Sequence, residues 1–345
     1  MRVLLVKMSS LGDVFHTFPA LTDAMNALPD LKVDWVVEQS FSEIPVWHPA
    51  VDKVFPIRLR EWRKHPIASR HEIRHFFQQI NETHYDLVLD AQGLLKSVWV
   101  AKKVHAPIVG MDWSSVREPL ASLFYNKKVS VDKTLHAIER LRILFSKALG
   151  YDFSTAPVSY DLNTVDWQKI KLADEAEYYV FLHGTTWDTK FWPISKWVAL
   201  ASELVQRGRS VVLPWGTEEE QNRSLEIKKQ VDSAVQMSGQ NIVVPKNKLT
   251  LNEMARLLKF ASGIVSVDTG LSHVAAALDV PMVVLYRVTD PEKIGAQGRL
   301  VTHLVSPEAK NYLKSFKNTE QETSSLIGLD VDSVLKALNG LVSDD

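Results

Sequence analysis

The sequence contains no cysteine among its 345 residues. This absence excludes disulfide frameworks, thiolate zinc sites and cysteine nucleophiles, and it is compatible with a reducing compartment. An excess of charge is also missing, since 40 Lys and Arg residues stand against 41 Asp and Glu residues. Because no overall positive field attracts nucleic acid, we expect no nucleic-acid partner and look for anion recognition in local clusters.

Long apolar runs are absent as well. The chain nowhere has the roughly 18 consecutive apolar residues that a membrane-spanning helix needs. Its first residues, MRVLLVK, hold only a short apolar run before Lys7, which is less than a signal peptide requires. We therefore expect no export signal and only a peripheral membrane role. The chain also lacks a P-loop and a GxGxxG motif, which disfavours kinase, ATPase and dehydrogenase functions.

What the chain does contain is a repeated alternation of short apolar runs and helical stretches. The runs lie at residues 3–6, 33–37, 87–89 and 108–109, and again at 178–182, 211–213, 264–267 and 282–286. Such alternation predicts parallel sheets with crossover helices. A polar segment, 152–175, separates the two series. The sequence thus predicts two α/β domains, residues 1–160 and 161–320, which face a central cleft.

The chain end, residues 321–345, predicts a helix near 334–341, for which one arrangement is packing back on the first domain. The residues DVD at 330–332 imitate a metal-binding DxD signature there. Because they directly precede this helix, far along the chain from the other motifs, we interpret Asp332 as its N-cap.

Asp13 follows Ser10, Leu11 and Gly12 at the point where the first strand turns into the first helix. Gly12 permits a close backbone approach at this turn, which faces the predicted cleft. A carboxylate there can accept the proton of an attacking hydroxyl. It can equally complement the positive end of its own helix, and the residues alone favour this second role.

A strand also runs into a polar turn at VSVDTGLSH, residues 265–273. The amides of Thr269, Gly270 and Leu271 at the start of the next helix suit a diphosphate, and Asp268 then faces sugar hydroxyls. A helix whose Asp268 and Thr269 satisfy their own amides is an equal alternative.

Two further groups follow strands of the second domain. Lys190 comes after HGTTWDT, residues 183–189, and suits a diphosphate partner that balances charge on a departing nucleotide. Glu220 is placed like the acidic residues that bind ribose hydroxyls in open α/β sheets. The alternatives are a solvated lysine and an acidic run, EEE at 218–220, that faces solvent.

A basic cluster lies in a predicted loop of the first domain and consists of Arg58, Arg60, Arg63 and Lys64. Guanidinium groups bind carboxylates and phosphates in bidentate fashion, so this cluster suits a large acidic acceptor. A solvated cationic loop has comparable weight.

The residues HEIRH, 71–75, match the zinc-protease pattern literally. Helical spacing places Ile73, Phe76, Phe77 and Ile80 on one apolar stripe, with His71 and His75 on the opposite face. No third ligand follows at a suitable distance. A zinc peptidase using His71 and His75 is therefore a remote alternative.

Four motifs stand in order along the chain: KMSSLGD at 7–13, DAQGLLKS at 90–97, REPLASLFYN at 117–126 and SVDTGLSH at 266–273. Together they closely resemble the type I lipopolysaccharide heptosyltransferases of glycosyltransferase family 9. The resemblance extends from Met1 to about residue 294. One departure lies at Arg287, where the family usually has glycine, in a loop expected beside the donor.

The resemblance implies a GT-B fold with two Rossmann-like domains, the first binding the acceptor and the second the nucleotide-sugar. It implies inverting transfer of L-glycero-D-manno-heptose from ADP-heptose to the Kdo of Kdo2-lipid A, in lipopolysaccharide inner-core synthesis. No cofactor, obligatory metal or required protein partner is implied. The place of action is the cytoplasmic face of a Gram-negative inner membrane, reached peripherally. Heptosyltransferase II is the nearest alternative within the family.

The resemblance also assigns roles to residues. Asp13 is the expected catalytic base, and Lys190 assists departure of the nucleotide. The expected donor-site residues are Thr185, Thr186, Lys190, Glu220, Asp268, Thr269, Gly270 and His273. The expected acceptor-site residues are Ser10, Gly12, Arg58, Arg60, Arg63, Lys64 and Arg117.

Overall fold

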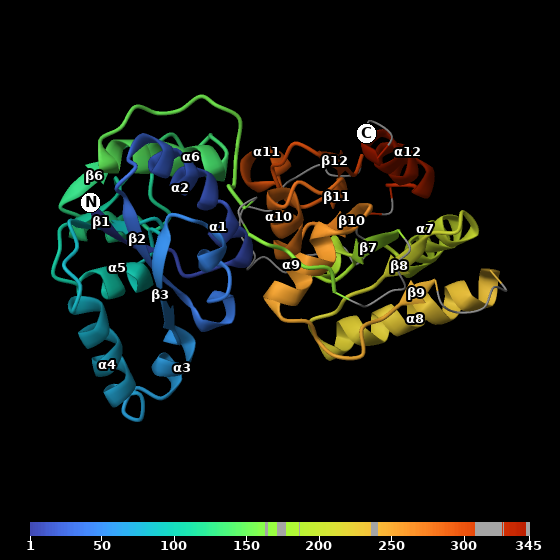
Figure 1. Ribbon diagram of the computed structural model, residues 1–345, viewed down its shortest axis with the longest axis horizontal. Helices are drawn as coiled ribbons and strands as arrows, with labels where there is room; N and C mark the ends of the chain where they lie inside the picture. The colour runs from blue at the N-terminus through green and yellow to red at the C-terminus, as the bar shows by residue number, and fades with distance from the viewer. Residues whose placement is uncertain are drawn as a thin grey trace. The chain divides into compact units, whose positions relative to one another are not determined.

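The structure is a computed structural model that describes residues 1–162, 165–170, 177–185, 187–235, 241–307, 326 and 328–342. The chain divides into two compact units, Met1–Val165 and Asp166–Asp345. Each unit is built on its own six-stranded sheet (Figure 1).

The first unit alternates strands and helices, as the apolar runs predict. Its strands are β1 (Arg2–Val6), β2 (Lys32–Glu38), β3 (Val51–Ile57), β4 (Leu87–Asp90), β5 (Ile108–Met111) and β6 (Lys127–Val129). Its helices are α1 (Leu11–Phe15), α2 (Phe18–Ala27), α3 (Leu59–Lys64), α4 (Arg70–Asn81), α5 (Leu95–Ala101) and α6 (Ala137–Leu149). Short 3-10 helices are η1 (Gln39–Phe41), η2 (Pro45–Trp47) and η3 (Pro119–Phe124).

The second unit repeats the pattern. Its strands are β7 (Tyr178–Leu182), β8 (Ser210–Val212), β9 (Ile242–Val243), β10 (Gly263–Val267), β11 (Met282–Tyr286) and β12 (Val301–Val305). Its helices are α7 (Ile194–Gln206), α8 (Glu218–Val235), α9 (Leu251–Lys259), α10 (Gly270–Ala277), α11 (Pro291–Ile294) and α12 (Val331–Val342), with the 3-10 helix η4 (Asp188–Lys190).

Both sheets are parallel at every described strand pair and share one topology. The strand orders are β3-β2-β1-β4-β5-β6 and β9-β8-β7-β10-β11-β12. In each sheet the order reverses between the first and fourth strands, β1 and β4 or β7 and β10. Such a switch point is where doubly wound sheets bind ligands, beyond the carboxyl ends of the strands. The prediction of two Rossmann-like α/β domains is confirmed.

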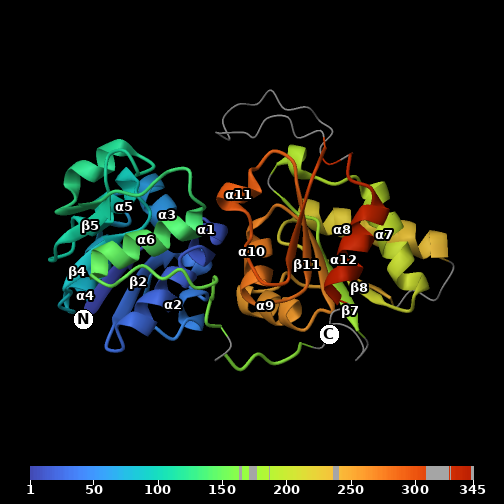
Figure 2. The same ribbon diagram turned by 90° about the horizontal axis from the view of Figure 1, so that it is seen from above.

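Helices cover both faces of each sheet. In the first unit α3, α4 and α5 join one core with the strands, and α2 packs on α6 over the other face (Figure 1). In the second unit α7, α8 and α12 share a core with the sheet, while α9 and α10 pack together on the opposite face (Figure 2). Because both faces are buried, β7 and β11 are apolar throughout, and β1 is apolar from Val3 to Val6.

The last helix packs on the sheet of its own unit, since its buried residues Val334, Leu335 and Leu338 belong to the core of the second unit. Gly263 of β10 makes room for it, since a Cβ at that glycine would come within 3.0 Å of Leu338. The predicted N-cap of this helix is wrong, because Asp330, not Asp332, accepts the Ser333 amide, at 2.7 Å.

Among the described residues, no helix combines the length and apolar character that crossing a bilayer demands.

We predict that Leu338→Ala lowers the free energy of unfolding of the second unit by about 2–5 kcal/mol, because it leaves a cavity under α12. The exposed neighbour Lys336 supplies the control, and Lys336→Ala should change stability by less than about 0.5 kcal/mol. Urea unfolding followed by circular dichroism measures both. Equal effects of the two substitutions would contradict the packing of α12 on this sheet.

Candidate active site

The first switch point is organised around the buried carboxylate of Asp90, at the end of β4. Its Oδ1 accepts the backbone amides of Gln92 and Gly93, each at 3.0 Å. Its Oδ2 accepts the hydroxyls of Ser97 at 2.9 Å and Tyr125 at 2.8 Å. Burial raises the pKa of Asp90, although these donors oppose the shift. The four contacts fix the turn that follows β4.

That turn in turn holds the loop after β1. The Gln92 side-chain oxygen accepts the amides of Met8 at 2.9 Å and Ser9 at 3.1 Å. Gly93 has φ +67°, and a Cβ there would lie 2.7 Å from Val116. Because both the backbone conformation and the space favour glycine, the turn has little freedom to change.

Asp13 occupies the third position of α1, the helix that follows the loop after β1. Its Oδ1 accepts Lys7 Nζ at 3.2 Å, and its Oδ2 accepts the amide of Ser10 at 2.9 Å and its hydroxyl at 3.0 Å. Asp13 therefore does complement its own helix start, and its side chain still remains 30% exposed. Both roles that the sequence left open are compatible with this geometry.

The electrostatic setting keeps Asp13 ionised. Burial by itself would raise the pKa of Asp13, but the charges of Lys7 and His16 and the hydrogen bonds from Ser10 outweigh it and hold the pKa well below its usual range. Lys7 is itself buried, and its ammonium also donates to the carbonyl of Ala91 at 3.2 Å. An ionised carboxylate is the form in which a general base works.

A cavity of about 100 Å³ opens beside Asp13. It brings Lys7, Asp13, Arg117 and Arg140 together with the turn after β4. Arg140 is fixed there, because its guanidinium donates to the carbonyl of Ser115 at 2.6 Å. The site thus combines one ionised carboxylate with several cations, which suits an acidic sugar acceptor.

The prediction that the basic cluster lies in a loop is wrong. Residues Leu59–Lys64 form helix α3, because Leu59 and Trp62 face the core while Arg58, Arg60, Arg63 and Lys64 stay exposed. None of these four cations lines the cavity. Arg60 is connected indirectly, through Glu38 and Lys96, to the loop that carries Asp13. Burial raises the pKa of Glu38, and the backbone amides of Arg60 and Leu59 oppose this shift. The charge of Lys96 opposes it as well. Lys96 in turn donates to Ser9 Oγ at 3.0 Å.

The second switch point also carries a lysine–aspartate ion pair. Lys190, in η4 after β7, donates to Asp268 Oδ2 at 2.6 Å, and both side chains are about nine-tenths buried, with 11% and 10% exposed. Asp268 follows β10, and Thr269 is the N-cap of α10, with Gly270 as the first helical residue. The pair therefore lies at a helix N-terminus, where amides and the helix dipole favour an anion.

The remaining predicted donor residues surround the same edge. Thr185 is half-buried after β7, and Thr186 lies outside the described residues. Glu220 turns back from α8 and accepts the Gly216 amide at 2.6 Å, and its carboxyl group packs against Gly184. It therefore points toward the ends of β7 and β8 rather than into solvent.

His273 and Arg287 lie farther along the chain. His273 is buried one turn into α10, and Arg287 is half-buried after β11. Arg287, which stands where the family usually has glycine, thus lies in the loop after β11, at the same edge of the second sheet.

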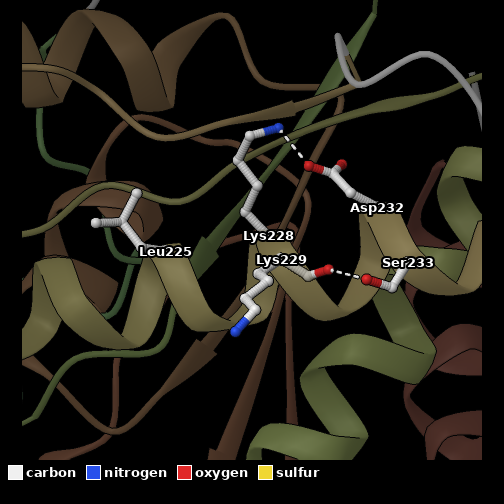
Figure 3. Close-up of a pocket in the computed structure, with 5 residues that line it drawn as sticks. All are labelled: Leu225, Lys228, Lys229, Asp232 and Ser233. Carbon is white, nitrogen blue, oxygen red and sulfur yellow. Dashed lines mark hydrogen bonds and ion pairs between the residues drawn. The ribbon is translucent and has the colours of Figure 1, made fainter.

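Two other features, the α4 histidines and a hollow along α8, offer no comparable group of candidate catalytic side chains. His71 and His75 are exposed on α4, opposite the buried Phe76, Phe77 and Ile80, and the described residues hold no group of three or more potential metal ligands. A hollow of about 450 Å³ runs along α8. Its Lys228 pairs with Asp232 at 3.0 Å, and Ser233 donates to the carbonyl of Lys229, so these groups are engaged within one helix (Figure 3).

Sequence reasoning missed Lys7, Asp90, Gln92, Lys96 and Arg140 as site residues. Lys7 ends an apolar run and precedes a polar turn, and this is the signal that could have identified it. Three others stand in the DAQGLLKS motif, but their partners are 83 to 87 residues away for the Gln92 and Lys96 contacts, which a local pattern does not reveal.

Comparisons with known proteins identify the family of the chain. Residues 73–324 match the sequence model of glycosyltransferase family 9 (heptosyltransferase). Lipopolysaccharide heptosyltransferase 1 of Pseudomonas aeruginosa is 48% identical over 310 residues, which cover 89% of this chain and 84% of that protein.

Solved structures give the same result. The Escherichia coli heptosyltransferase WaaC with ADP is 39% identical, with a TM-score of 0.86, and the match covers 99% of this chain and 100% of that chain. The same enzyme with ADP-2-deoxy-2-fluoro heptose is 39% identical, with a TM-score of 0.83 over 99% of both chains.

We predict that Lys7→Met raises the pKa of Asp13, because it removes the largest of the effects that oppose burial, the positive charge of Lys7. The depressed pKa stabilises the folded chain above the unfolded value of about 3.9, and this stability is lost as the pH falls through the folded value. Lys7→Met should therefore weaken the acid dependence of unfolding. Carboxyl ¹³C titration, with Asp13→Asn to assign the signal, measures the shift. Lys7→Arg keeps the charge and should leave the pKa low; an unchanged Asp13 pKa in Lys7→Met would contradict the pairing.

Proposed function

Because this chain belongs to glycosyltransferase family 9, the heptosyltransferases, we propose that its two switch points each bind one substrate of a heptosyl transfer. The chain is a glycosyltransferase of lipopolysaccharide inner-core synthesis. The donor that we propose is ADP-L-glycero-D-manno-heptose, and the acceptor is the Kdo sugar of Kdo2-lipid A. A relative with 48% identity is a heptosyltransferase 1, so the heptosyltransferase II alternative is not favoured.

The observation that carries the proposal is the ionised Asp13 beside a cavity lined by cations. In the proposed step Asp13 takes the proton of an acceptor hydroxyl while the hydroxyl oxygen bonds to the anomeric carbon of the heptose. The bond from that carbon to the ADP oxygen breaks on the opposite side, so the configuration inverts and ADP leaves with the electron pair. Arg117 and Arg140 at the cavity suit the carboxylate of an acidic sugar.

The second switch point suits the donor. The Thr269–Gly270 turn at the start of α10 offers amides to a diphosphate, and Lys190 is held beside it by Asp268. Positive charge placed there stabilises the departing ADP as its negative charge grows. Glu220 and Thr185 are proposed to contact the nucleoside and sugar hydroxyls. Because Lys190 and the dipole of α10 are available to balance the charge of a diphosphate, the proposal includes no obligatory metal or cofactor.

The lipid anchor of the proposed acceptor sets the place of action. We place the enzyme at the cytoplasmic face of the inner membrane, in peripheral contact with the bilayer, with the α3 cations Arg58, Arg60, Arg63 and Lys64 toward phosphates or carboxylates of the acceptor. No protein partner is required by this mechanism. Mass-spectrometric detection of heptose added to Kdo2-lipid A from ADP-heptose tests the whole assignment, and absence of the product with active controls would refute it.

Asp13→Asn should lower kcat by roughly 10²–10⁴-fold, because the amide cannot accept the proton. ADP binding, measured by calorimetry, should change little, since the donor site belongs to the second unit. The exposed Asp30 supplies the matched control, and Asp30→Asn should retain normal turnover. Near-normal turnover in a folded Asp13→Asn enzyme would remove Asp13 from the mechanism.

Lys190→Ala should lower kcat by roughly 10²–10³-fold, because its charge acts most strongly on the developing ADP anion. Lys190→Arg should recover part of this loss. Lys228→Ala on α8 also removes a paired lysine and should have no effect on turnover. Steady-state kinetics with varied ADP-heptose separates the variants, and the same assays with EDTA test for a metal requirement. An effect confined to the KM for the donor would assign Lys190 to uniform donor binding instead.

A further inference from the structure

Two elements of the first unit expose large apolar side chains next to one another. Helix α5 exposes Leu95 and Trp99, at 44% and 38%, and η3 exposes Leu120, Leu123 and Phe124, at 53%, 60% and 45%. The two elements pack together, and the Leu95 amide donates to Glu118, the residue before η3, at 2.7 Å. We call these five side chains the α5–η3 surface.

The burial pattern in η3 is the reverse of that in a segment whose large apolar residues pack into the core. Its buried residues are the small Ala121 and Ser122, while the large apolar residues face outward. In a 3-10 helix residues three apart lie on one face, so Leu120 and Leu123 align and Phe124 adjoins them. Contiguous exposed apolar surface in a soluble domain marks an interaction site.

The net charge of the segment that carries the α5–η3 surface indicates the kind of partner. Between residues 94 and 130 the chain has six Lys and Arg residues but only two Asp and Glu residues. Both acids are engaged locally, since Asp112 accepts the Ser115 amide at 2.9 Å and Glu118 accepts the Leu95 amide. Lys102 and Lys103, at the end of α5, are exposed.

Apolar side chains, a tryptophan and exposed lysines together suit the interface of an anionic bilayer. We propose that the α5–η3 surface docks the enzyme on an anionic lipid membrane by inserting Leu120, Leu123 and Phe124 between the headgroups. The surface adjoins the catalytic cavity, because Lys96 of α5 contacts the loop that carries Asp13 and the chain between α5 and η3 supplies Val116 and Arg117 to the cavity wall.

Docking there brings the cavity to the level of a lipid-anchored sugar. The inference rests on the proposed function, since such an acceptor is what makes this position useful. It also assigns the hydrophobic part of membrane binding to α5 and η3, rather than to the cationic helix α3.

The absence of native cysteine makes a direct test possible. Leu120→Cys and, as a control, Leu225→Cys on α8, with 53% and 48% exposure in the natural chain, each offer one labelling site for an environment-sensitive fluorophore. Acceptor-free vesicles of phosphatidylethanolamine and phosphatidylglycerol should shift the emission of the label at position 120 to the blue and leave that at 225 unchanged. No shift at 120, or equal shifts at both positions, would overturn the proposal.

A second measurement uses the double variant Leu123→Ser/Phe124→Ser. Vesicle co-sedimentation should fall at least about tenfold, since burial of two large apolar side chains is lost. Transfer to detergent-solubilised Kdo2-lipid A should remain normal. Unchanged co-sedimentation would refute membrane docking. A blue shift at position 120 that depends on protein concentration in the absence of vesicles would also refute it, in favour of contact with a second copy of the chain. Failure of transfer by the unaltered enzyme would instead refute the proposed function.

Discussion

The buried carboxylate of Asp90 is the contact on which the first switch point depends. Through Gln92 and Gly93 it fixes the turn after β4, and Gln92 then holds the amides of Met8 and Ser9. The loop that presents Asp13 is therefore positioned by residues more than 80 positions away. Each of the four donors offsets part of the cost of burying the Asp90 carboxylate, so the residues that supply them are energetically coupled.

Much of the fold follows from the sequence because parallel strands buried on both faces need continuous apolar runs. The helix at 59–64 does not follow so easily. Its inward Leu59 and Trp62 are only two apolar positions among four cations, and the core that receives them comes from α4 and α5. The side of α12 is decided in the same way, by Gly263 leaving room on β10. Local periodicity identifies a helix, whereas the partner of its apolar face is a tertiary property.

The candidate site shows the same limit. The position of Asp13 after the first strand is readable from the chain, because a switch point lies there in this topology. The contacts that give it a low pKa cannot be predicted from the sequence, since Lys7 directly follows β1, His16 directly follows α1, and only the fold brings both charges to Asp13. Likewise, Lys190 and Asp268 stand 78 residues apart and meet only because β7 and β10 are neighbours.

The low pKa of Asp13 has a consequence for the proposed transfer. A carboxylate held ionised by Lys7 is always ready to accept a proton, but it is also a weaker base than a free one. Such a base is effective if the proton moves late, after the bond to the departing ADP has largely broken and positive charge has grown on the sugar. In the proposed mechanism the heavier demand then falls on the second switch point, where Lys190 and the start of α10 are proposed to bind the ADP anion. In the proposed mechanism the two ion pairs therefore have separate roles, since Lys7 keeps the proton acceptor Asp13 ionised and the Lys190–Asp268 pair places a cation beside the leaving group.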